Sequence, residues 1–170
     1  MYVGEVVSQL SHAIQCAMQA EAHRQPTHVI LGALLHDMGT LVGTERGAPT
    51  LYSKSGENIG PGDHDLHGEN FLKEMGFPWE IYQFARAHVQ AMQYNCYKEM
   101  QYKDKLSWAS ATFMDEHLTP MTEEEVKEFE SRKDFELMVQ FRIWDEDAKD
   151  PNVQLTPLEK YRAVAKEYLL

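Results

Sequence analysis

An adjacent histidine and aspartate, His36 and Asp37, are the residues of this chain best suited to chemistry. They follow the apolar run Ala33-Leu34-Leu35 and come shortly before Gly39, so we expect them at the end of a largely apolar helix. Burying ionisable groups is costly unless they are paired or bind a metal. The sequence therefore predicts that this pair belongs to a metal site rather than to ordinary core packing.

Four further residues extend this pair into an ordered pattern of candidate ligands. His12 precedes the pair, and His64, His88 and Asp145 follow it. Four imidazoles and two carboxylates make a mixed nitrogen and oxygen set, which suits iron, manganese or cobalt better than a closed thiolate zinc site. One carboxylate can bridge two metals, and Asp37 is the natural candidate. Each histidine alone could equally be a hydrogen-bonded core residue, so the ordered set carries the prediction.

The residues around these positions carry a family likeness over most of the chain. The matching segments are 2–5, 9–17, 33–39, 64–72, 87–91, 120–130 and 142–149. Together with the six ligand positions they resemble the HD-domain mixed-valent diiron oxygenases, which include myo-inositol oxygenase and the phosphonate-cleaving oxygenases. Within that family the chain is most similar to the enzymes acting on 2-amino-1-hydroxyethylphosphonate and on its trimethylamino relative.

This resemblance implies a cofactor and a reaction. It implies two iron ions, Fe(II) and Fe(III), with O2 as co-substrate and a small phosphonate as substrate. One iron would be held by His12, His36, Asp37 and Asp145, and Asp37 would bridge to a second iron held by His64 and His88. The implied reaction cleaves the C–P bond of a 1-hydroxyalkylphosphonate and releases phosphate and a carboxylic acid.

The resemblance also implies roles for residues that are not ligands. Tyr2 and Glu5 would close off the oxygen-binding position until substrate arrives, whereas their alternative is an ordinary chain terminus with a helix-start glutamate. Arg142 carries a guanidinium suited to bidentate phosphonate binding. Ser110 matches a phosphonate-contacting serine, although a small residue on a packing face is equally plausible. His67 is expected beside the ligands or exposed, with substrate contact as the functional alternative.

One position departs from the family pattern. Met92 stands where the relatives carry a substrate-contacting lysine, so that contact is missing here or comes from another lysine, with candidates Lys98, Lys103 and Lys105. The far end of the substrate could meet the aromatic side chains of Tyr94, Tyr97 and Trp108, which could hold a methylated ammonium group. Core packing is the commoner explanation for any aromatic residue. The histidines without motif context, His23, His28 and His117, are expected at the surface.

The elements that position these residues are predicted to be helical nearly throughout. Apolar spacing and capping signals place helices at 5–23, 26–36, 64–76, 104–113, 122–131, 134–148 and 157–169, and a further helix that opens at Pro78 and carries His88. Asp63 is the expected cap of the helix with His64, and Thr122 with Glu125 forms a capping box. Residues 43–62 are expected to form a long irregular loop, and no strand is expected. The prediction is an all-α, HD-domain helical bundle, with residues 1–170 as a single domain around the metal site.

Composition narrows the class of partner. A net charge of −11 argues against nucleic acid, because phosphate backbones require a basic surface. No apolar run approaches the length of a membrane span. The two cysteines, Cys16 and Cys96, are expected as free thiols in a reducing compartment. No signal peptide is visible, so a cytoplasmic protein is expected, and we also expect a monomer or weak homodimer.

Two other functions remain open. An HD-type metal phosphohydrolase acting on a phosphate ester would use the same six ligands, since a two-metal clamp also serves hydrolysis. A non-catalytic phosphonate or metal sensor could retain the site as well. The match at Tyr2, Glu5 and the C-terminal segment favours the oxygenase, and the intact ligand set makes the sensor less favoured.

Overall fold

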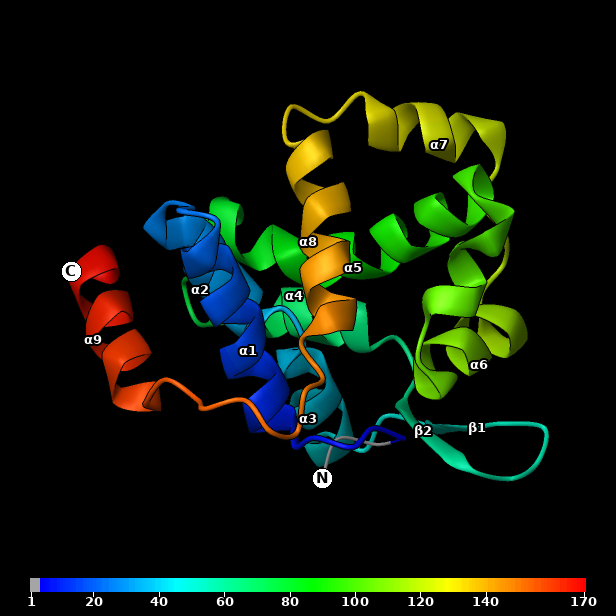
Figure 1. Ribbon diagram of the computed structural model, residues 1–170, viewed down its shortest axis with the longest axis horizontal. Coiled ribbons are helices and arrows are strands. Elements are labelled where there is room, and N and C mark those ends of the chain that lie inside the picture. Colours follow the sequence, from blue (N-terminus) through cyan, green and yellow to red (C-terminus); the bar gives the residue numbers. More distant parts are fainter. Residues whose placement is uncertain (1–3) are drawn as a thin grey trace.

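The computed structural model describes residues 4–170, and most of its regular structure is helical (Figure 1). The elements are α1 (Gln9–Ala22), α2 (Thr27–Leu35), α3 (Met38–Glu45), β1 (Thr50–Tyr52), β2 (Asn58–Pro61), α4 (His64–Glu74), α5 (Trp79–Lys98), the 3-10 helix η1 (Met100–Lys105), α6 (Trp108–His117), α7 (Glu123–Glu130), α8 (Phe135–Asp147) and α9 (Leu158–Leu169). The predicted all-α class is confirmed. None of the described helices is both long and apolar enough to cross a membrane.

Local sequence signals explain where several helices begin. The Ser8 hydroxyl accepts a hydrogen bond from the Ser11 backbone N–H, which starts α1. Pro26 and Pro78 occupy the positions just before α2 and α5, where a proline costs no helical hydrogen bond. At α7, Thr122 and Glu125 form the predicted capping box.

Helix α5 forms the centre of the bundle. In Figure 1, α8 crosses in front of α5, and α2 and α4 also pack against it. The main core lies at this crossing, where the rings of Phe84 and Phe141 meet edge to face at 5.0 Å between centroids. Helix α9 docks at the edge of the bundle, where its fully buried Tyr161 packs against Ile14 and Ala17 of α1.

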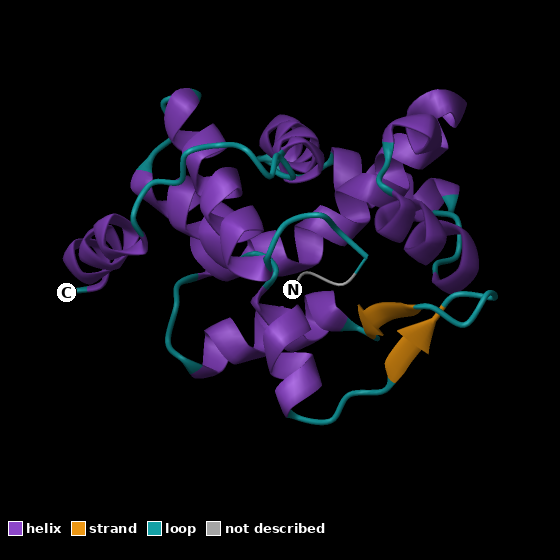
Figure 2. Ribbon diagram, turned by 60° about the horizontal axis from the view of Figure 1, so that its bottom comes forward, coloured by secondary structure: helices purple, strands orange, loops and turns teal. Residues whose placement is uncertain are grey.

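The long loop predicted for residues 43–62 is wrong in two respects. Helix α3 continues to Glu45, and the segments 50–52 and 58–61 pair as an antiparallel hairpin with Leu51 opposite Gly60 (Figure 2). The pairing is three residues long on one side and carries a register shift beside Tyr52, which leaves too little alternation for a sequence pattern to detect.

Three predicted helix boundaries also require correction. The first helix begins at Gln9 rather than residue 5, because Ser8 caps it. Asp63 precedes α4 but caps nothing with its side chain, because its backbone adopts a left-handed conformation with φ of 50°. The helix predicted at 104–113 is instead η1 followed by α6, which starts after Ser107 because that hydroxyl accepts from the Ser110 backbone N–H.

Helices α3 and α4 contact each other backbone to backbone at two glycines. A methyl group at Gly39 would lie 1.7 Å from the carbonyl oxygen of His64 and 2.5 Å from the amide nitrogen of Gly68. A side chain at position 39 is therefore incompatible with this spacing, and Gly39 sets the distance between Asp37 and His64.

Candidate metal centre

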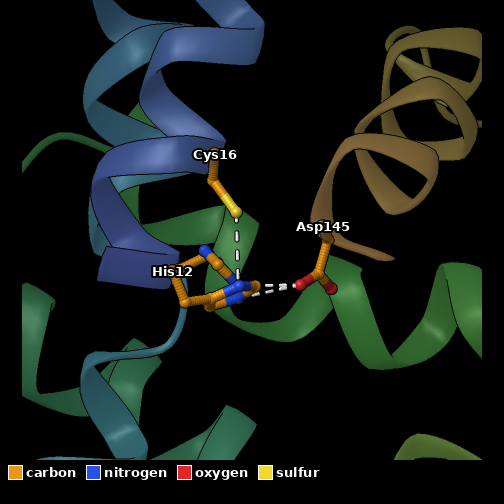
Figure 3. Close-up of side chains that lie close together, drawn as sticks. His12, Cys16 and Asp145 are labelled. Carbon is orange, nitrogen blue, oxygen red and sulfur yellow. Dashed lines mark hydrogen bonds and ion pairs between the residues drawn. The ribbon is translucent and has the colours of Figure 1, made fainter. Parts of the chain in front are cut away.

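The first cluster of candidate ligands lies where α1, the end of α2 and α8 converge. His12 Nε2 lies 3.1 Å from Asp145 Oδ1, and His36 Nε2 lies 3.4 Å from the same oxygen. Cys16 Sγ lies 3.8 Å from His12 Nε2, and Figure 3 shows the three labelled side chains of His12, Cys16 and Asp145 pointing toward one another. All four side chains are buried, so their polar atoms need partners in the interior.

The second cluster lies next to the first and consists of Asp37, His64 and His88. Its candidate ligand atoms lie within 4.8 Å of one another. His64 Nε2 and His88 Nε2 face each other at 3.1 Å. The His36 ring lies 5.3 Å from the His12 ring and 5.1 Å from the His88 ring between centroids, so His36 links the two clusters.

Backbone carbonyls orient two of these imidazoles. His12 Nδ1 donates to the Ala148 carbonyl at 3.0 Å, and His36 Nδ1 donates to the Ala33 carbonyl at 2.7 Å. Because a carbonyl can only accept, Nδ1 of each ring carries a proton, and Nε2 is the ring atom that faces the cluster. Metal-ligating histidines are commonly oriented in this way.

The Asp37 carboxylate receives one hydrogen bond on each oxygen. Gln9 Nε2 donates to Oδ2, and Thr40 Oγ1 donates to Oδ1 at 2.8 Å. Burial opposes ionisation of Asp37, but the surrounding imidazoles, led by His36, lower its pKa to about 2. Asp37 is therefore an anion at neutral pH, which is the form that binds metals.

The electrostatics of the histidines and of Cys16 also fit a metal site. Burial lowers the pKa of His88 to about 3, so His88 is a neutral imidazole with an available lone pair. Burial raises the pKa of the Cys16 thiol well above its ordinary value. A protonated thiol is a poor ligand, so the histidines and carboxylates are the better donor set.

Polar atoms without hydrogen-bond partners support this assignment. Among the described residues, His36 Nε2 and His88 Nδ1 are buried without a hydrogen bond of acceptable geometry. The facing Nε2 atoms of His64 and His88 cannot both present lone pairs at 3.1 Å unless a proton or cation lies between them. A metal ion at the first cluster would supply the partner that His36 Nε2 lacks, and one at the second would accept the facing Nε2 lone pairs of His64 and His88, so the residues fit two metals.

Arg142 lies beside the first cluster and is almost fully buried, with 3% of its surface exposed. Its guanidinium donates to Asp145 Oδ2 and to Glu146 Oε2, and Nη2 lies 3.4 Å from the Ser110 hydroxyl. Burial opposes the charge on Asp145, but Arg142 and the nearby imidazoles hold its pKa well below the usual range. Arg142 thus acts directly on a candidate ligand.

Lys149 is a residue that the sequence reasoning missed. Its ammonium lies 3.0 Å from Glu5 Oε1 and 3.0 Å from Glu146 Oε1, and it donates to Ser107 at 2.9 Å. Ser107 in turn donates to Glu5. Its partner Glu5 lies at the other end of the chain, so no local spacing signalled this contact.

A cavity of about 70 Å³ opens onto the clusters. Its described lining comprises Glu5, Asp37, Thr40, Ile59, Gly60, Pro61, His64, His88, Val89, Met92, Ala109, Ser110, Phe113, Arg142 and Asp145. The structure therefore brings the six predicted ligands together, with Glu5, Ser110 and Arg142 beside them.

Other predicted site residues lie elsewhere. Tyr2 falls outside the described residues. His67 lines a neighbouring, larger cavity instead. The candidate lysines Lys98, Lys103 and Lys105 pair with Glu130, Asp115 and Glu99, and the described lining of the small cavity does not include Tyr94, Tyr97 or Trp108.

The fold and the buried clusters define a helical protein able to hold metal ions, and comparisons with known proteins place it in a family. No protein-family model matches the chain. It is 34% identical over 168 residues to an uncharacterised protein of Acanthamoeba polyphaga mimivirus, covering 99% of this chain and 74% of that one. It is 33% identical over 153 residues to [1-hydroxy-2-(trimethylamino)ethyl]phosphonate dioxygenase (glycine-betaine-forming) of Leisingera caerulea, covering 90% and 74%.

A third relative has a related name. Hydroxymethylphosphonate dioxygenase of Gimesia maris is 27% identical over 168 residues, covering 99% of this chain and 81% of that protein. The chain belongs to the family of the Leisingera caerulea phosphonate dioxygenase.

Proposed function

We propose that this protein is an HD-domain diiron oxygenase that cleaves the C–P bond of a 1-hydroxyalkylphosphonate with O2. The products are inorganic phosphate and the carboxylic acid formed from the hydroxyl-bearing carbon. The proposal includes residues 1–170 acting as a single HD domain in the cytoplasm, without nucleic acid as a partner. The observation that carries it is the pair of adjacent buried clusters in a chain related to phosphonate dioxygenases.

The two clusters divide the ligands in a way that supports two metal ions. His12, His36 and Asp145 would hold one iron, and Asp37, His64 and His88 would hold the other, with Asp37 shared between them. When bound, the two irons supply the redox chemistry that O2 activation requires. The protein supplies the ligand geometry and limits access to the site.

The overall reaction balances without a further reductant. RCH(OH)PO3H2 and O2 yield RCOOH and H3PO4, so the substrate carbon loses four electrons and O2 gains them. One atom of O2 enters the carboxylic acid and the other enters the phosphate. This balance gives an isotope signature that a hydrolase acting on an ester cannot produce.

The chain's own polar residues bind and orient the anionic substrate. Arg142 and Ser110 line the cavity beside Asp145, where a guanidinium and a hydroxyl can donate to phosphonate oxygens. Lys149 adds a buried positive charge behind Ser110, at 3.4 Å from its hydroxyl. This positive charge compensates for Met92, which lines the same cavity without a donor.

Glu5 is proposed to control access, together with Tyr2. Its carboxylate lines the cavity while Lys149 and Ser107 hold it. Substrate that draws Arg142, Ser110 or Lys149 toward its phosphonate would loosen this arrangement and open the oxygen-binding position.

Oxygen dependence tests the function. We expect iron-loaded protein to release phosphate from hydroxymethylphosphonate only when O2 is supplied, and ¹⁸O2 to label both products. Asp37→Ala should abolish this, whereas Asp65→Ala, at the second His-Asp pair, should not, because Asp65 pairs with Arg86 away from the clusters. Anaerobic turnover of a phosphate ester, without O2 uptake on any phosphonate, would instead establish the phosphohydrolase.

A further inference from the structure

A second cavity adjoins the metal-facing one and is much larger. It measures about 550 Å³, against about 70 Å³ for the cavity at the clusters. The two cavities share Val89 of α5 and Phe113 of α6 in their described linings. These two side chains therefore form a partition between the cavities.

Phe113 occupies the middle of this partition. Its ring lies 5.2 Å from the His64 ring on the metal side and 6.5 Å from the His117 ring on the other side, between centroids. Helix α6 contributes Ser110 to the small cavity and His117 to the large one. About two turns of helix separate Ser110 from His117, and Phe113 lies between them, one turn after Ser110.

The small cavity leaves little room beyond the reacting group. A buried water needs about 10–15 Å³ on this measure, so the cavity has space for roughly five waters. Pockets for larger ligands occupy about 300–1,000 Å³. Two metals, a phosphonate group and its hydroxyl-bearing carbon would fill most of the small cavity, and Ile59, Met92 and Phe113 form an apolar part of its wall.

The large cavity, in contrast to the apolar wall of the small one, is lined by more acidic than basic side chains. Four carboxylates line it, from Asp63, Asp65, Glu125 and Glu128, against two guanidinium groups, from Arg86 and Arg132. Arg86 pairs with Asp65, and Arg132 pairs with Asp134. The aromatic rings of Phe113, His117 and Phe129 also face it. Excess carboxylates with aromatic rings favour a cationic group, particularly a methylated ammonium.

We infer that Phe113, with Val89, restricts this enzyme to 1-hydroxyalkylphosphonates whose C1 substituent is hydrogen or a short uncharged group. The inference rests on the proposed function, because it concerns the substrate of that same site. Phe113 acts as a specificity-determining residue through steric exclusion. Removing its ring joins the cavities and gives a long or cationic substituent a space with suitable chemistry.

Three substrates test the partition: hydroxymethylphosphonate, 1-hydroxybutylphosphonate and [1-hydroxy-2-(trimethylamino)ethyl]phosphonate. For the iron-loaded wild-type protein we expect kcat/KM to be about 100-fold higher for the first than for the other two, since steric pockets discriminate by about this much. In Phe113→Ala this ratio should fall at least tenfold. The increase in kcat/KM should be larger for the cationic substrate than for 1-hydroxybutylphosphonate, because carboxylates line the added space. Dissociation constants of the three substrates, measured without O2, should rank the substrates in the same order as kcat/KM does.

Two further variants separate a partition from a general loss of packing. Val89→Ala removes the other half of the partition and should also narrow the ratio, even if Phe113→Ala folds poorly. Leu51→Ala enlarges the large cavity without touching the partition and should keep the wild-type ratio. Wild-type turnover of all three substrates at equal kcat/KM, or an unchanged ratio in both partition variants, overturns the inference. Absence of O2-dependent phosphate release from every substrate overturns the proposed function instead.

Discussion

Replacing Arg142 with methionine should destabilise the metal-free protein strongly. Methionine keeps much of the side-chain volume but removes the guanidinium from two buried carboxylates, Asp145 and Glu146. Breaking a buried ion pair by deleting one partner costs roughly 3–5 kcal/mol, because the remaining charge is left uncompensated. In a chain of 170 residues this corresponds to a decrease in melting temperature of about 10 °C.

The same change should weaken metal binding at the first cluster. Without Arg142 the pKa of Asp145 rises, and its carboxylate loses the hydrogen bond that orients it. We expect metal analysis to show loss from the cluster with His12 and retention at the cluster with His64. Because Arg142 also lines the cavity, substrate binding should decrease in the protein that remains loaded.

Thermal unfolding of the chelator-treated protein, followed by circular dichroism, measures the loss of stability in the metal-free state. Arg46→Met provides the control, because Arg46 forms an exposed pair with Glu74 and such pairs contribute about 0–1 kcal/mol. A melting temperature for Arg142→Met within about 2 °C of that for Arg46→Met would contradict the role assigned to the buried guanidinium. Arg142→Lys should recover only part of the stability, since an ammonium cannot reproduce the planar fork.

Three other outcomes test the site. Asp37→Ala should remove both metals together, as measured by metal analysis, whereas loss of only one metal would show that Asp37 is not shared. Gly39→Ala should lower the melting temperature and the content of the second metal, because the new methyl group displaces the His64 backbone; unchanged metal content would refute that coupling. Between pH 6.5 and about 3 the unfolded chain binds a proton at His88 that the folded metal-free protein excludes, so stability should fall with decreasing pH by about 1.4 kcal/mol per unit. His88→Gln should flatten that dependence in chemical denaturation, and an unchanged slope would contradict it.

The helical class and the grouping of the candidate ligands could be predicted because each depends on strong local signals. Thr122 and Glu125 mark a helix start by residue type alone, and the structure forms that capping box. The His36-Asp37 pair stands out because ionisable groups seldom end an apolar helix without a function. His64 and His88, its neighbours in space, were predicted from the ordered pattern and the family likeness rather than from periodicity.

The remainder depends on tertiary contacts that local patterns do not encode. The β1–β2 hairpin is too short for alternation to show, and Asp63 adopts a left-handed backbone that no capping rule anticipates. Lys149 lies two residues beyond the end of α8, and its importance arises from Glu5 at the other end of the chain. Arg142 was singled out for its guanidinium, but the sharing of that group between Asp145 and Glu146 was not predicted.

The two clusters differ in how much of the chain must be folded before each can exist. Asp37, His64 and His88 come from three consecutive helices, between the start of α3 and the middle of α5. The other cluster joins His12 near the start to Asp145 near the end, and the His12 ring is held by the Ala148 carbonyl. During synthesis, contacts between neighbouring elements can form first, whereas the most distant contacts close last. In the proposed two-metal site, one position could therefore assemble on a growing chain, whereas the other would become available only when α8 has docked, so metal loading would follow the order of folding.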